Sequence, residues 1–175
     1  MRRMGGLRKY MPITYLTVLI GALANAGFPP FAGFFSKDSI IEAVHHSTTA
    51  GAGFAYALIL AGVFVGGFYS FRLVFFAFHG EERFRHAGGH HGDHGEGHHG
   101  HHVEPHESPK VVTVPLILLA IPSVLIGLWA IGPMLFGDFF ENVIPVSDSH
   151  PAMKELAGHF HGWFAMATHA VLTLP

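Results

Sequence analysis

The sequence has no cysteine and few charged residues. Only 13% of its 175 residues are Asp, Glu, Lys or Arg, against about 25% in a typical soluble domain. The absence of cysteine excludes a disulfide framework and a metal site built on thiolates. Half of the residues are hydrophobic and the mean hydropathy is +0.38. This composition excludes an ordinary soluble domain and indicates a membrane chain.

The few charges are also unevenly placed. Residues 111–137 carry none, and a spanning helix needs about 20 consecutive apolar residues. Between residues 12 and 79 the charged residues are Lys37, Asp38, Glu42 and Arg72. We therefore predict an all-α, polytopic membrane helix bundle with one discontinuous, proline-broken transmembrane helix.

The predicted segments follow from the apolar runs and the polar stretches between them. They are a cytoplasmic flank (1–11), the discontinuous helix (12–46), a transmembrane helix (52–78), a His-rich disordered cytoplasmic loop (80–109), another transmembrane helix (110–132), a periplasmic connection (133–157) and the start of a truncated further helix (158–175).

Gly27, Pro29, Pro30 and Gly33 interrupt the first apolar run. Proline removes a backbone donor and disfavours helix in the residue before it. A helix over residues 12–27 would reach only about 24 Å, short of the roughly 30 Å hydrocarbon core. Two short helical pieces joined across the prolines therefore suggest one discontinuous span. A tight helical hairpin is the alternative.

The distribution of basic residues chooses between these two topologies. With three crossings, one side receives only Lys154, and the other side receives Arg2, Arg3, Arg8, Lys9, Arg83, Arg85 and Lys110. Basic residues favour the cytoplasmic face, so we expect the amino terminus and the His-rich loop there. A hairpin would place basic ends on opposite sides, which favours the discontinuous span.

Lys37 and Asp38 follow the break and are the candidate proton-transfer residues. An ionised residue at membrane depth costs at least ~2.5 kcal/mol and is a functional candidate by default. Irregular backbone at that depth lines a protein-enclosed or wet cavity. Because burial disfavours the ammonium form, a buried Lys37 could load and release a proton, with Asp38 adjusting this balance. The alternatives are a static ion pair and a lysine that extends to the headgroup region.

The segment 80–109 holds nine histidines among glycines and acidic residues. Clustered imidazoles bind Zn²⁺, Ni²⁺ or Cu²⁺, but a structural site has a few ligands at fixed spacing on an ordered frame. The signal here is compositional, so we predict no metal site. A non-transport membrane scaffold with a metal-binding His loop is kept as an alternative function.

Three stretches carry a resemblance to a known family: MGGLRK (residues 4–9), GFPPFAGFFSKD (27–38) and FYSFR (68–72). They resemble the antiporter-like, ND5-type subunit L of respiratory complex I, in its carboxy-terminal half. The resemblance is strongest over residues 4–80, and full subunits of this family are several times longer. A fragment of this length is not expected to pump protons alone.

The resemblance implies a role in the proton-translocating membrane arm of NADH:quinone oxidoreductase, in the bacterial inner membrane. It implies that Lys37 is the lysine of a discontinuous helix near the periplasmic outlet of a proton half-channel, with Asp38 beside it. NADH, FMN, iron-sulfur clusters and quinone are expected in partner subunits, and no cofactor in this chain. Expected partners are other membrane-arm subunits, the lipid bilayer and protons, and no nucleic acid. The large subunit of an Mrp-type Na⁺/H⁺ antiporter is the alternative.

Overall fold

The computed structural model describes residues 4–86 and 104–140 and the single residues 143, 158, 162, 164 and 168. Within these residues every element is helical: η1 (Leu7–Lys9), α1 (Pro12–Ala26), α2 (Ala32–His45), α3 (Ala52–Phe78), α4 (Arg83–His86), α5 (Lys110–Ile131), η2 (Gly132–Phe136) and η3 (Asp138–Phe140). The all-α prediction is confirmed. The helix expected over 158–175 and most of the connection at 133–157 lie outside the described residues.

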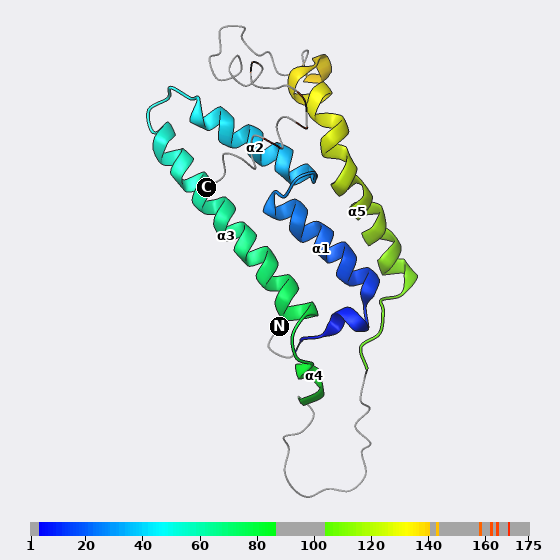
Figure 1. Cartoon of the computed structure of the whole chain (residues 1–175). Coiled ribbons are helices and arrows are strands. Elements are labelled where there is room, and N and C mark those ends of the chain that lie inside the picture. Colours follow the sequence, from blue (N-terminus) through cyan, green and yellow to red (C-terminus); the bar gives the residue numbers. More distant parts are fainter. Residues whose placement is uncertain are drawn as a thin grey trace, which may run out of the picture.

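Helices α1 and α2 run in the same direction, one after the other, between α3 and α5 (Figure 1). α3 returns in the opposite direction, and α5 runs alongside α1 and α2. At 1.5 Å per residue, α1 and α2 are only about 22 and 21 Å long, too short to cross the core singly. Helix α3 and the continuous segment Lys110–Leu135 are each long and apolar enough to cross a membrane. The predicted discontinuous helix is therefore present, and the hairpin is not formed.

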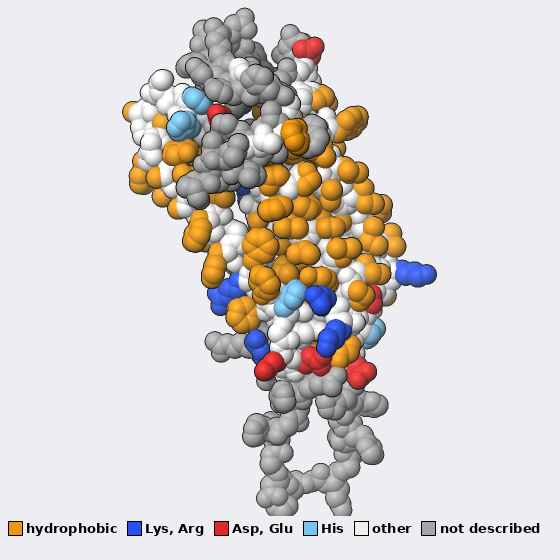
Figure 2. Space-filling view, viewed as in Figure 1, with side chains coloured by type: hydrophobic (Ala, Val, Ile, Leu, Met, Phe, Trp, Pro, Cys, Tyr) orange, Lys and Arg blue, Asp and Glu red, His pale blue; other side chains and the backbone are white. Residues whose placement is uncertain are grey.

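The outer faces of α3 and α5 are apolar and uncovered. Phe64 is 76% exposed and Trp129 is 80% exposed, and Figure 2 shows hydrophobic side chains over the middle of the molecule. Soluble monomers rarely expose contiguous apolar patches larger than a few hundred Å². Such an apolar surface suits contact with lipid tails or with neighbouring membrane helices.

Charged side chains gather at one end of the molecule, which we call the basic end (Figure 2). α1 and α5 begin there and α3 ends there (Figure 1). Glu82 lies at this end 4.0 Å from the Lys9 amine and accepts a hydrogen bond from the Tyr10 hydroxyl at 3.3 Å. The opposite end, where α2 ends and α3 begins, is the outer end. The basic end is the one that the sequence predicts to be cytoplasmic.

α2 packs closely against α5 through a glycine. A Cβ on Gly127 would lie 2.8 Å from the Ala32 Cα, so the absence of a side chain lets the two backbones approach. Phe34 and Phe35 are 4% and 2% exposed and pack against Leu128 and Ile131. This small core holds α2 next to α5, just beyond the break.

The ends of the predicted disordered loop carry structure. Residues 83–86 form α4, and Glu107 reaches the start of α1. Its carboxylate accepts the backbone N–H of Ile13 at 2.7 Å and the Thr14 hydroxyl at 2.6 Å. The first N–H groups of a helix lack intrahelical partners and carry partial positive charge. The prediction of a loop without structure thus does not hold at its two ends, because Glu107 caps α1 from 94 residues away.

Glu107 makes the stability of this contact depend on pH. Partial burial raises the pKa of Glu107, but the hydrogen bond from the Thr14 hydroxyl and three from backbone N–H groups outweigh it. The pKa therefore lies below its ordinary value. Such a group stabilises the fold above the unfolded value of about 4.3, and this contribution is lost as pH falls through the lowered folded value.

We predict that Glu107→Gln lowers the free energy of unfolding by about 1 kcal/mol at neutral pH, the usual value of a helix cap. The difference should be smaller at a pH of about 3, because the stabilisation is lost as pH falls through the lowered pKa of the folded-state carboxyl. Thermal unfolding in detergent at both pH values measures this, with the exposed Glu104→Gln as control. An equal loss at both pH values would contradict the capping role.

Candidate functional site at the helix break

Helix α1 ends in a glycine cap that leaves one carbonyl open to other donors. Gly27 has φ 82°, a left-handed conformation that favours glycine. The N–H groups of Gly27 and Phe28 donate to the carbonyls of Ala24 and Leu23 at 3.2 and 3.0 Å, which is the Schellman arrangement. The carbonyl of Asn25 takes no part in this cap.

The amine of Lys37 donates a hydrogen bond to the Asn25 carbonyl. Lys37 lies in the second turn of α2, so its side chain reaches back across the break to the end of α1. A helix carries partial negative charge at its carboxyl end, which stabilises a cation there. The broken helix therefore supplies the ammonium group with a partner that a continuous helix would not offer.

Each predicted break residue has a distinct place in this geometry. Gly27 ends α1, and a Cβ there would lie 3.2 Å from the Lys37 Cδ. Pro29 and Pro30 form the connection, with a cis peptide bond between them. A Cβ on Gly33 would lie 1.8 Å from the carbonyl oxygen of Ala24. Gly33 thus lets the first turn of α2 rest on the last turns of α1.

Lys37 is partly exposed, which differs from the predicted buried lysine. It lines an open groove of about 210 Å³ between α2 and α3, together with Ile40, Ile59, Gly62 and Val63. Gly62 belongs to this lining, and nothing lies within 4 Å of a Cβ placed on it. The lining is otherwise apolar, and Lys37 is the only charged residue in it.

Titratable residues follow Lys37 along α2 towards the outer end. Asp38, Glu42 and His46 are spaced four residues apart, which places them on one face of the helix. The Glu42 Oε1 and His46 Nε2 atoms are 3.2 Å apart, and each side chain is 26% exposed. Of these three residues the sequence predicted a role only for Asp38, although the spacing of four relates Glu42 and His46 to it.

Asn25 and Ser70 were also missed. The Asn25 side-chain amide donates to the Ser70 hydroxyl at 2.8 Å, joining α1 to α3 next to Lys37. The available signal was a polar amide inside the apolar run 12–27. Its partner on α3 was not predictable from spacing within one helix.

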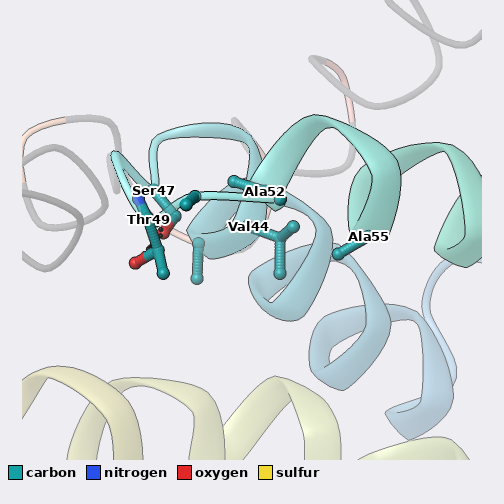
Figure 3. Close-up of a pocket in the computed structure, with 8 residues that line it drawn as sticks. Val44, Ser47, Thr49, Ala52 and Ala55 are labelled. Carbon is teal, nitrogen blue, oxygen red and sulfur yellow. Dashed lines mark hydrogen bonds between the residues drawn. The ribbon is translucent and has the colours of Figure 1, made fainter.

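A second hollow of about 320 Å³ lies at the turn between α2 and α3. The residues labelled in Figure 3 come from the end of α2, the turn and the start of α3. The hydroxyls of Ser47 and Thr49 lie 3.1 Å apart there. None of the residues lining this hollow has a titratable side chain, so it offers room at the outer end but no acid–base chemistry. Its lining is Ala43, Val44, Ser47, Thr49, Ala50, Gly51, Ala52 and Ala55.

No metal site is formed by the residues that the structure describes. Within them, no three side chains of His, Cys, Asp or Glu come together as a metal would require. The rings of His45 and His46 meet edge to face with centroids 5.1 Å apart, but they are only two. Most of the histidine-rich segment, residues 87–103, lies outside the described residues.

The sequence of this chain is similar to those of known proteins. A family model described as NADH:quinone oxidoreductase/Mrp antiporter, TM, matches residues 1–68, which include the break and Lys37. NADH-quinone oxidoreductase subunit L of Neisseria meningitidis serogroup A is 59% identical over 98% of this chain and 26% of its own length. Over almost its whole length the chain is similar to subunit L.

Relatives with lower identity also match this chain. NAD(P)H-quinone oxidoreductase chain 5 of a Picosynechococcus species is 47% identical over 81% of this chain and 21% of its own length. Subunit L of Mycobacterium tuberculosis is 42% identical over 86% of this chain and 21% of its own length. The chain thus spans about a quarter, or less, of the length of these curated subunit L and chain 5 relatives. The predicted resemblance to subunit L is confirmed, and with it a membrane-protein family.

We predict that Gly33→Ala destabilises the chain by about 1–3 kcal/mol, because the added methyl group collides with the backbone of α1. Gly21→Ala is the matched control, since nothing lies within 4 Å of a Cβ there. In a helix interior that change should be neutral or stabilising by up to about 1 kcal/mol. Unfolding in detergent compares the two, and equal stability of both variants would contradict the close approach at Gly33.

Proposed function

We propose that this chain is part of the proton-translocating membrane arm of NADH:quinone oxidoreductase, in a bacterial cytoplasmic membrane, and that Lys37 relays protons there. The similarity to subunit L supports the setting. The observation that carries the role of Lys37 is the placement of its amine against the open carbonyl at the break between two short apolar helices.

Two features surround the Lys37 amine. The Asn25 carbonyl and the negative end of α1 stabilise the ammonium form. The rest of the groove lining, with Ile40 and Ile59, is apolar and supplies no counter-charge. A change in a neighbouring charge, or a movement of the α1 end, shifts the protonation equilibrium of the amine. Lys37 would then gain a proton in one state of the enzyme and release it in another.

The residues beyond Lys37 support an outward route along α2. Asp38 follows Lys37 in the chain and adds a carboxylate next to it. Glu42 lies one helical turn further, and neighbours at this spacing have Cβ atoms about 5–6 Å apart. Carboxylates and imidazoles both transfer protons near neutral pH when suitably placed. The Glu42–His46 pair would pass the proton to water at the outer end.

Electron transfer would take place in partner subunits. Iron-sulfur clusters are held mainly by cysteine thiolates, and this chain has no cysteine. We propose that NADH, FMN, the clusters and quinone bind elsewhere in the enzyme. Other membrane-arm subunits and lipid would cover the exposed apolar faces of α3 and α5.

A Na⁺/H⁺ antiporter of the Mrp type is the second candidate, because the description of the matching family model names it. The relatives reported above are oxidoreductase subunits, which favours the first candidate. The neighbouring genes distinguish the two: genes for other complex I subunits on both sides support the oxidoreductase, and Mrp genes support the antiporter.

We predict that Lys37→Ala in the complete enzyme lowers proton pumping to less than about a tenth, since acid–base groups contribute typically 10²-fold or more. NADH oxidation with an artificial electron acceptor should be largely unchanged. Acidification of inverted membrane vesicles and acceptor reduction measure the two activities. Lys110→Ala, an exposed lysine at the basic end, is the control. Wild-type pumping by Lys37→Met would refute the relay.

For the outward route we predict that Glu42→Gln lowers pumping several-fold, because the amide keeps the size of the side chain but cannot carry a proton. Glu81→Gln, at the basic end, should pump like the wild type. Initial pumping rates at matched enzyme content test this. If Glu42→Gln and Glu81→Gln are indistinguishable, protons do not leave through Glu42.

A further inference from the structure

We infer that Asn25 and Ser70 are positioning residues for Lys37. Their hydrogen bond fastens the end of α1 to α3 and so fixes the carbonyl that binds the Lys37 amine. The inference rests on the proposed role of Lys37 as a proton relay.

Asn25 contacts both neighbouring helices, each with a different part of the residue. Its backbone carbonyl accepts the hydrogen bond from Lys37 on α2. Its side-chain Nδ2 donates to the Ser70 Oγ on α3 at 2.8 Å. Because the anchor and the acceptor belong to one residue, holding the side chain against α3 limits the movement of the carbonyl.

The direction of the Asn25–Ser70 hydrogen bond is fixed by a second hydrogen bond of the Ser70 hydroxyl. The Ser70 hydroxyl donates its single proton to the Gly66 carbonyl at 2.8 Å. It can therefore only accept from Asn25, whose amide must present its NH₂ group. This chain of bonds gives the amide one orientation, as a positioning role requires.

The Ser70 half of this contact is buried, whereas Asn25 is exposed. Ser70 is only 6% exposed and lies on the face of α3 that also buries Val74 and Ala77. A hydrogen bond between polar groups is stronger in such surroundings, and an unsatisfied group is correspondingly costly. The end of α1 is otherwise a helix terminus of the kind that frays. The Asn25–Ser70 hydrogen bond opposes fraying at Asn25, whose carbonyl accepts the hydrogen bond from Lys37.

Few other charged side chains are near enough to Lys37 to influence its protonation. Along α1 and along residues 111–131 of α5 there is no charged side chain, and α3 carries only Arg72, towards the basic end. The other titratable side chains of α1 and α3 are tyrosines. On α2 itself, Asp38 adjoins Lys37, and Glu42, His45 and His46 lie further towards the outer end. The protonation of Lys37 should therefore respond to the position of the Asn25 carbonyl.

The test measures proton pumping against pH in the complete enzyme for Asn25→Leu and Ser70→Ala. Both changes release the α1 end, so the ammonium form loses support and the alkaline limb of the pH profile should move to lower pH by about half a unit or more, roughly a threefold change in the proton equilibrium. The double variant should shift no further than the single ones, because both remove one interaction.

Ser39→Ala is the matched control. Ser39 is 7% exposed and donates to the Phe35 carbonyl at 2.8 Å, as Ser70 does to Gly66. The Asn25 amide bonds Ser70 and not Ser39. The pH profile of Ser39→Ala should therefore coincide with that of the wild type. A shift in Ser39→Ala equal to that in Ser70→Ala would show a general packing effect and overturn the inference.

A second variant keeps the inference testable if Asn25→Leu fails to assemble. Asn25→Asp keeps the size of the side chain and accepts from Ser70 once the Ser70 hydroxyl turns from the Gly66 carbonyl, while it adds a negative charge beside the amine. Its alkaline limb should move to higher pH, opposite to Ser70→Ala. A shift in the same direction, or none, would overturn the inference.

The failure of this inference differs from the failure of the proposed function. Profiles for Asn25→Leu and Ser70→Ala that coincide with the wild type, while Lys37→Ala abolishes pumping, would remove the positioning role alone. Normal pumping by Lys37→Ala would remove the relay itself.

Discussion

The structure depends on one interaction, between the Lys37 amine and the backbone carbonyl of Asn25. An ammonium group among apolar helices needs a partner, and a continuous helix uses its carbonyls internally. Ending α1 with Gly27 frees a carbonyl, and the first turn of α2 brings Lys37 within reach of it. Gly33 permits this, because no side chain stands between the start of α2 and the backbone of α1. The break is thus a binding site for the cation of the same chain.

The remaining polar contacts hold the two short helices at their ends. Glu107 caps the first turn of α1, and Asn25 joins the last turn of α1 to Ser70 on α3. Phe34 and Phe35 hold the beginning of α2 against α5. Between these points the helices contact one another through apolar and small side chains. A short helix fixed at both ends keeps its open carbonyl in place, while the outer faces of α3 and α5 remain apolar.

The sequence was sufficient to predict the features that depend on local chemistry. Composition and the apolar runs predicted the membrane helices, and the glycines and prolines predicted the break beside Lys37. The predictions failed where residues far apart in the chain meet. Glu107 lies 94 residues from Ile13, and Asn25 lies 45 residues from Ser70. Neither pair has a periodicity that would reveal it. The exposure of Lys37 also depended on the neighbouring helix, since residues of α3 line its open groove.

The central claim is that the Lys37 amine gives up its proton and takes it back, and a substitution by arginine tests it most directly. A guanidinium group keeps the positive charge and can donate to the Asn25 carbonyl, but it is not deprotonated in proteins. The measurement is proton pumping by Lys37→Arg in the assembled enzyme, with NADH oxidation by an artificial acceptor as the reference. The account predicts loss of pumping with the reference activity kept. Pumping at the wild-type rate would show that a fixed positive charge is sufficient, and would contradict the account.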